Sequence, residues 1–166
     1  MQQDFSRNGG FSLFSLDLQF FYLQTVEKAD KINKYLSKEV KPLYRLLVVD
    51  SDAMDQEAVC DMLDWSRYGF DNIIQAGSYA EAVDLALDQN PQIILVDAEL
   101  DGGKGYALIS QLRRSGSAAV FCLMSRRNTK DELHRAMRSG ARECLHQPVQ
   151  EEELRSFVGN GARNQI

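Results

Sequence analysis

The sequence predicts an α/β protein of three layers, in which a parallel five-stranded sheet lies between helices, preceded by an N-terminal helical extension. From residue 43 onward, short apolar segments alternate with segments whose apolar residues recur at helical spacing. The short segments are apolar along nearly their whole length, which is typical of strands that are buried on both faces of a parallel sheet. This regular alternation favours right-handed crossovers and helices on both faces.

The expected strands end in polar residues at several places. The first strand, YRLLVV, is followed directly by Asp50, Ser51 and Asp52, and the third strand, QIILVD, ends on Asp97. In open parallel sheets the site lies beyond the carboxyl ends of the strands, so these residues are site candidates. The five expected strands are residues 44–49, 71–77, 92–97, 118–124 and 142–146.

Five helices are expected to follow these strands. Ser78 begins the second helix, and Glu81 stands three residues later, which is the spacing of a capping box. Gly116 and Gly140 are expected to end the third and fourth helices. The expected helices are residues 53–65, the helix that opens at Ser78, 106–116 after a turn-rich loop at 100–105, 129–140 and 151–159.

Residues 1–42 stand outside the alternation. Residues 1–10 are expected to be a flexible start, and residues 15–41 to form a helix that ends at Pro42. Its apolar stripe could pack on the domain, on a second copy or on another protein. The stripe consists of Leu18, Tyr22, Ala29, Ile32 and Leu36. The expected parts are the extension at 1–42, a domain at 43–159 and a flexible tail at 160–166.

Composition and charge limit the classes of function. The 166 residues carry a formal net charge of -5, which gives no support to binding of nucleic acid or of an anionic membrane. The apolar stretch at residues 11–23 is too short to span a bilayer. The three cysteines, Cys60, Cys122 and Cys144, have neither metal-binding spacing nor a disulfide framework, so we expect a cytoplasmic protein.

Four strand ends are expected to meet at one edge of the sheet. Asp50 follows the first strand, Asp97 ends the third, Ser125 ends the fourth, and Gln147 stands before a proline after the fifth. These ends are neighbours if the strand order is 2-1-3-4-5, which is the flavodoxin-like arrangement. Each acid alone could equally cap a helix or a turn, and only their joint placement favours a site.

With these residues in place, the sequence resembles the receiver domain of bacterial two-component response regulators, over roughly residues 43–159. The resemblance implies that Asp97 is the phosphoacceptor position, and that Ser125 and Gln147 are the switch and phosphate-contact positions. The segment DWSRYGF, residues 64–70, is similar to receivers that are attached to AraC-type DNA-binding domains.

The resemblance also implies a site for Mg²⁺, an ion that prefers hard oxygen ligands in octahedral geometry. The candidate ligands, for weak binding at most, are Asp50, Asp52, Asp97 and Glu99. Beside them, Arg126 and Arg127 could bind an anion or simply belong to a solvated loop.

Two positions of the site depart from the family pattern, and milder changes lie at Asp101, Lys104 and Cys144. Ser51 stands where the second acid of the pair belongs, so this metal-ligand position is degenerate. Gln147 stands where a lysine belongs and brings no charge to a phosphoryl group. Cys144 occupies the place of the aromatic switch residue.

These departures favour a pseudo-receiver, which signals by binding other proteins and has no catalytic residues and no cofactor, or only weakly bound Mg²⁺. The alternative is a response regulator that a histidine kinase phosphorylates on Asp97. A flavodoxin-like enzyme or nucleotide binder is less favoured, because no glycine-rich phosphate loop follows the first strand. The expected partner is a signalling protein or a histidine kinase, or a second copy bound through the N-terminal helix, and not nucleic acid or membrane.

Overall fold

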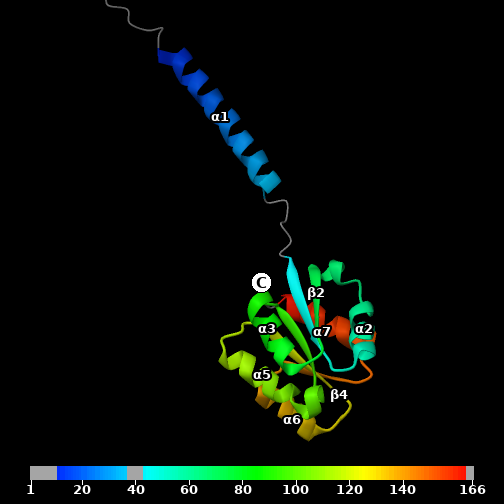
Figure 1. Ribbon diagram of the computed structural model, residues 1–166. Coiled ribbons are helices and arrows are strands. Elements are labelled where there is room, and N and C mark those ends of the chain that lie inside the picture. The colour runs from blue at the N-terminus through cyan, green and yellow to red at the C-terminus, as the bar shows by residue number, and fades with distance from the viewer. Residues whose placement is uncertain (1–10, 37–42, 164–166) are drawn as a thin grey trace, which may run out of the picture. The chain divides into compact units, whose positions relative to one another are not determined.

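The computed structural model describes residues 11–36 and 43–163, and it describes side chains for residues 18–32 and 43–160. The chain forms two units, Met1–Lys41 and Pro42–Ile166, and each is described by itself (Figure 1). The expected flexible start at 1–10, the end of the first helix at Pro42 and residues 164–166 lie outside the described residues.

The second unit contains a five-stranded parallel sheet with the order β2-β1-β3-β4-β5, which confirms the predicted topology. The three central strands are nearly continuous runs of buried apolar residues, as the sequence predicted, whereas the two edge strands are largely exposed or half-buried. The strands are β1 (Tyr44–Val49), β2 (Phe70–Ala76), β3 (Ile93–Asp97), β4 (Val120–Ser125) and β5 (Glu143–His146).

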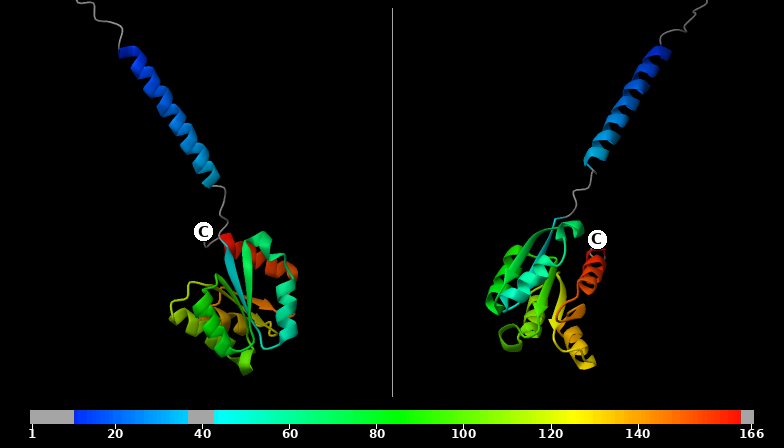
Figure 2. Two further views of the ribbon diagram at one scale, coloured as in Figure 1. Left: turned by 45° about the horizontal axis from the view of Figure 1, so that its top comes forward. Right: turned by 90° about the vertical axis from the view of Figure 1, so that its right-hand side faces the viewer.

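Helices cover both faces of the sheet, so the predicted three layers are present (Figure 2). Side chains alternate along each strand, so Leu47 faces the layer of α3, α5 and α6, while Leu46 faces α2 and α7. The helices are α2 (Ala53–Asp61), α3 (Tyr79–Gln89), α4 (Leu100–Gly103), α5 (Gly105–Arg114), α6 (Lys130–Ser139) and α7 (Glu151–Arg163), with a 3₁₀ helix, η1, at Trp65–Tyr68.

The helix caps agree with the sequence. The Ser78 hydroxyl accepts a hydrogen bond from the Glu81 N–H at 3.3 Å, and the Glu81 carboxylate accepts one from the Gly77 N–H at 2.8 Å. The return bond therefore reaches one residue further back than in a standard capping box. Gly140 ends α6 in the left-handed region with φ of 107°.

In the second unit, the ends of the first and last helices differ most from the sequence prediction. Helix α2 ends at Asp61 instead of residue 65, because the indole N–H of Trp65 donates to the Cys60 carbonyl at 2.7 Å and turns the chain. Trp65 then packs edge-on against Phe70, with ring centroids 5.8 Å apart. At the other end of the chain, α7 continues to Arg163, so residues 160–163 of the expected tail are helical.

The first unit contains α1, a helix of 26 residues from Phe11 to Leu36. It begins four residues before the predicted start at residue 15. Its described apolar side chains are exposed, with Phe21 at 72% and Tyr22 at 69%. No described helix is both long enough and apolar enough to cross a membrane.

Candidate functional site

The strand order brings the four predicted strand-end residues to one edge of the sheet. Asp97 pairs with Met124 in the β3–β4 register, which places Ser125 one residue further along. The N–H of Gln147 donates to the Ser125 carbonyl at 2.8 Å, so Gln147, which follows β5, lies beside the end of β4. All four strand-end side chains are buried: Asp50, Asp97, Ser125 and Gln147.

Asp50 is the more deeply buried of the two acids at the edge, with 3% of its surface exposed. Its Oδ1 accepts a hydrogen bond from the Asp52 N–H at 2.9 Å, whereas its Oδ2 has no partner among the described residues. Burial raises the pKa of Asp50 from its ordinary 3.8 to about 6, and the nearby charges of Asp97, Asp55 and Asp52 add to the rise. The fold therefore holds an acid whose charged form is unfavourable.

Asp97 shares this environment. Burial raises its pKa, and the charge of Glu99 adds to the effect. The Glu99 backbone N–H, the Arg126 charge and the Gln147 side-chain amide act in the opposite direction without cancelling the rise. The carboxylate thus lies at the predicted phosphoacceptor position but with little compensating positive charge.

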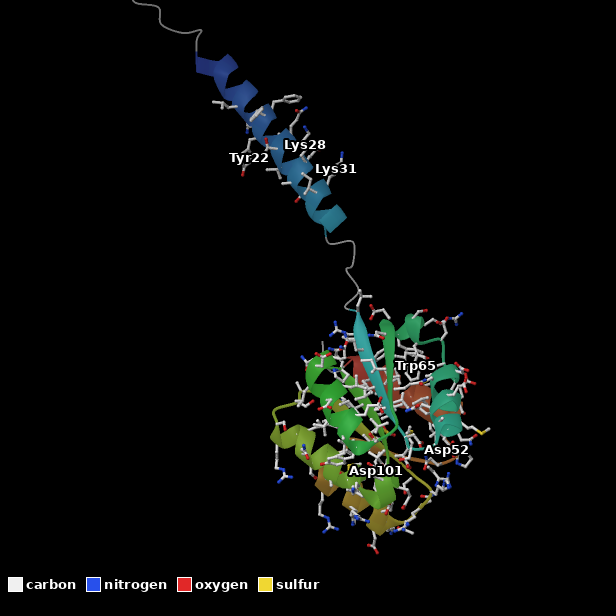
Figure 3. All side chains as sticks on the ribbon, viewed as in Figure 1. Tyr22, Lys28, Lys31, Asp52, Trp65 and Asp101 are labelled. Atoms are coloured by element: carbon white, nitrogen blue, oxygen red, sulfur yellow. The ribbon has the colours of Figure 1, made fainter. Side chains whose placement is uncertain are left out.

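Ser51 and Asp52 have local structural roles. The Ser51 hydroxyl accepts a hydrogen bond from the Asp101 N–H at 3.3 Å, and the Asp101 carboxylate accepts one from the Tyr79 N–H at 2.8 Å. Asp52 caps α2, since its carboxylate accepts from Met54 N–H at 2.9 Å and from the next N–H at 3.4 Å. Asp52 and Asp101 both lie at the end of the domain where β1 runs out (Figure 3).

The loop after Asp97 approaches it closely at Gly105. A Cβ built on Gly105 would lie 2.2 Å from the Asp97 carbonyl oxygen and 3.0 Å from the Ala98 Cα. Asp101 and Gly102, which precede Gly105 in the same loop, have positive φ angles of 46° and 79°. The predicted turn-rich loop at 100–105 therefore contains the short α4 and folds tightly onto the end of β3.

The two arginines after β4 bind carboxylates at the rim. Arg126 pairs with Asp55 at 3.1 Å, and Arg127 pairs with Glu99 at 3.5 Å. Both pairs are exposed, so each contributes at most about 1 kcal/mol. Because each guanidinium faces a carboxylate, the arginines belong to ion-paired loops more than to an anion pocket.

Two of the four candidate Mg²⁺ ligands have other contacts in the structure. Asp50 and Asp97 lie at the edge, but Asp52 caps a helix and Glu99 pairs with Arg127. In the part of the chain with described side chains, no three His, Cys, Asp or Glu residues are arranged to hold a metal ion. Asp50 and Asp97 remain as candidate carboxylate ligands, and Mg²⁺ that is held by one or two carboxylates completes its octahedral coordination with water.

The sequence reasoning missed Glu132 and Tyr106, which contact the site from the helices. The Ser125 hydroxyl donates a hydrogen bond to the Glu132 carboxylate at 2.7 Å, and the Tyr106 hydroxyl donates to the same oxygen. Glu132 stands three residues after Thr129, the N-cap of α6, so its spacing indicates a capping box. That signal points the carboxylate back to its own helix and so could not have revealed the contact with Ser125.

The other candidate side chains are simpler to place. Cys122 is buried in the sheet, and Cys144 is half-buried against the apolar layer of α3, α5 and α6. All three cysteines are free.

Comparison with known proteins finds one family for this chain. The model of the response regulator receiver domain matches residues 46–159. This stretch includes every strand-end residue of the site.

Individual relatives agree with that match. The chain is 30% identical to the phosphate regulon transcriptional regulatory protein PhoB of Escherichia coli over 112 residues, which are 66% of this chain and 48% of that protein. It is 26% identical to a cyclic di-GMP phosphodiesterase of Thermotoga maritima over 121 residues, 73% of this chain and 32% of that protein. The chain therefore spans half or less of the length of these curated relatives.

A solved structure has the same fold. The REC domain of AraT, a response regulator from Geobacillus stearothermophilus, superposes with a TM-score of 0.65 at 21% identity. The match covers 74% of this chain and 95% of that domain.

Proposed function

This chain belongs to the family of response regulator receiver domains, and from that premise we propose that it is a pseudo-receiver, which signals by binding other proteins with little or no control by phosphorylation. Phosphoryl transfer to a carboxylate depends on positioned charge around the transferred group. The observation that carries the proposal is the site's charge: two buried acids, a neutral Gln147 and rim arginines that already face carboxylates.

Three details support weak or absent metal binding. Ser51 is held by the Asp101 N–H, Asp52 caps α2, and Glu99 faces Arg127. Recruiting any of them to Mg²⁺ would break a contact that the fold uses. We therefore propose no resident cofactor and no catalytic residue, in a protein of the reducing cytoplasm whose partner is another signalling protein.

The proposal is tested by labelling with a small phosphodonor. The full chain is incubated with acetyl phosphate and Mg²⁺, and its intact mass is measured over time. We expect no acid-labile phosphate on the native chain. The matched positive control is Ser51→Asp combined with Gln147→Lys, which restores both missing charges and should take up phosphate. The combined variant with Asp97→Asn should lose it again, which fixes the labelled residue.

The alternative, a phosphoacceptor charged by a histidine kinase, has one observation in its favour. Asp97 is buried at the family's phosphoacceptor position, beside an Asp50 oxygen that has no partner among the described residues. Stoichiometric labelling of the native chain, abolished by Asp97→Asn, would establish this alternative and overturn the pseudo-receiver proposal.

We also propose that α1 pairs with α1 of a second copy. Leu18, Tyr22, Ala29 and Ile32 are all exposed and lie four, seven and three residues apart, which is heptad spacing. Lys31 lies nine positions after Tyr22, half a turn away, and Figure 3 shows the two on opposite sides of the helix. A single exposed helix gains most of its stability by packing such a stripe, and an identical helix has matching spacing.

A further inference from the structure

Glu132 is a buried carboxylate that neither the phosphoacceptor chemistry nor the helix cap requires. It is 5% exposed, in the first turn of α6. Its Oε1 accepts hydrogen bonds from two hydroxyls, Ser125 of β4 at 2.7 Å and Tyr106 of α5. One oxygen thus joins the strand end of the site to two helices on one face of the sheet.

Cationic groups surround the same carboxylate. The Arg135 guanidinium lies 3.9 Å from the centre of the Tyr106 ring. Burial would raise the pKa of Glu132, but the hydrogen bonds from Tyr106 and Ser125 and the charges of Arg127 and Arg135 lower it below its ordinary value. Glu132 is therefore ionised, and its hydrogen bonds are charge-assisted.

The arrangement uses the full capacity of the Ser125 side chain as a donor. A serine hydroxyl has one hydrogen, and this one is directed to Glu132. The same hydroxyl oxygen accepts from the Arg127 N–H at 3.1 Å. Ser125 cannot donate to an oxygen on neighbouring Asp97 without giving up its bond to Glu132.

We propose that Glu132 is a positioning residue, an internal anion that keeps the Ser125 hydroxyl turned away from Asp97 and holds the end of β4, α5 and α6 in one conformation. The inference deepens the proposed function, on which it rests: the face formed by α5, α6 and β5 would stay the same whatever happens at Asp97. We call the hydrogen bonds from Ser125 and Tyr106 to Glu132 the latch. Loss of the latch would allow that face to fluctuate.

Cys144 provides a readout at this face. It is half-buried on β5, and burial together with the charge of Glu132 raises its pKa to about 11. Its rate of reaction with a thiol reagent reports how often the face opens. Cys60, on α2 at the other face of the sheet, is also half-buried and serves as an internal reference. Peptide mapping by mass spectrometry separates the two rates.

The decisive variants leave the charge of Glu132 in place, so that electrostatics and opening are separated. Ser125→Ala and Tyr106→Phe each remove one hydroxyl donor and keep the carboxylate. We expect each to raise the rate of Cys144 relative to Cys60 about tenfold, the size expected for loss of one charge-assisted hydrogen bond. Glu132→Gln should raise it further, while Asp131→Asn, an equal charge change on the exposed neighbouring residue, should leave it unchanged.

Unchanged Cys144 rates in both Ser125→Ala and Tyr106→Phe would overturn the latch, as would an equal rise in Asp131→Asn. The thiol measurement involves no phosphodonor, so its outcome is separate from that of the labelling experiment. If the native chain takes up phosphate while the Cys144 rate stays the same before and after labelling, the pseudo-receiver proposal fails and the latch stands.

Discussion

Replacing Asp50 with asparagine should stabilise the protein at neutral pH. The buried Asp50 carboxyl has a pKa of about 6 in the folded protein against an ordinary 3.8. The difference between these two pKa values is equivalent to about 3 kcal/mol that the folded state loses when Asp50 ionises. Asparagine keeps the oxygen that accepts from the Asp52 N–H and puts an uncharged amide group where the unpartnered Oδ2 now lies.

The pH dependence follows from the direction of the shift. A carboxyl with a raised folded-state pKa favours folding while it is protonated, so its stabilising effect is complete below about pH 4 and is lost as the pH rises through about 6. The difference in stability between Asp50→Asn and the native chain should therefore be near zero at pH 4. It should grow through pH 5 and 6 and level off near pH 7, at about 2 to 3 kcal/mol.

Urea unfolding followed by Trp65 fluorescence measures both stabilities, since Trp65 is buried against Phe70 and its emission will change on unfolding. The control is Asp52→Asn, because the exposed Asp52 caps α2 and asparagine is an equally good N-cap. The reasoning is refuted if Asp50→Asn is no more stable than the native chain at pH 7. It is also refuted if the difference does not vary with pH or if Asp52→Asn reproduces it.

Three further changes test other parts of the structure. Asp97→Asn should raise the free energy of unfolding more in the native chain than in the Asp50→Asn variant, because the Asp50 and Asp97 charges repel each other only when both are present. Equal increases in a double-mutant cycle would contradict this coupling. Gly105→Ala should cost about 3 kcal/mol or more in urea unfolding, because its Cβ would meet the Asp97 backbone, whereas Gly159→Ala in open space on α7 should be neutral or stabilising. A chain that begins at Leu43 should stay folded and be monomeric by light scattering, whereas the full chain should be dimeric; unfolding of the shorter chain, or a monomeric full chain, would rule out pairing through α1.

Several features of the site were readable in the sequence because they depend on order along the chain. Apolar runs predict buried strands, and in a parallel sheet all strand ends of one kind lie at one edge. The residues directly after those runs were therefore placed correctly at the edge, including Asp50, Asp97, Ser125 and Gln147. The replacement of an acid by Ser51 and of a lysine by Gln147 was also visible, because the family pattern says which residue type is expected at each of these positions.

The partners of those residues were not readable, because hydrogen bonds across the fold depend on side-chain direction. Asp52 could have reached toward the site, and the structure turns it onto α2 as a cap. At Ser51 the sequence shows only the loss of an acidic ligand, whereas in the structure the Ser51 hydroxyl accepts a hydrogen bond from the N–H of Asp101, fifty residues away.

Sequence alone determined the three layers and the residues that follow each strand, because hydrophobic periodicity acts locally and repeats along the chain, whereas the strand order was expected from the resemblance to receiver domains and is confirmed by the sheet. Only the tertiary structure decided that Asp50 has a carboxyl oxygen without a partner, and that Glu132 turns from its own helix cap to Ser125 and Tyr106. The physical reason is that the charge state and direction of a buried polar group are set by everything packed around it. Those neighbours come from β4, α5 and α6, which are separate in the sequence and meet only in the folded domain.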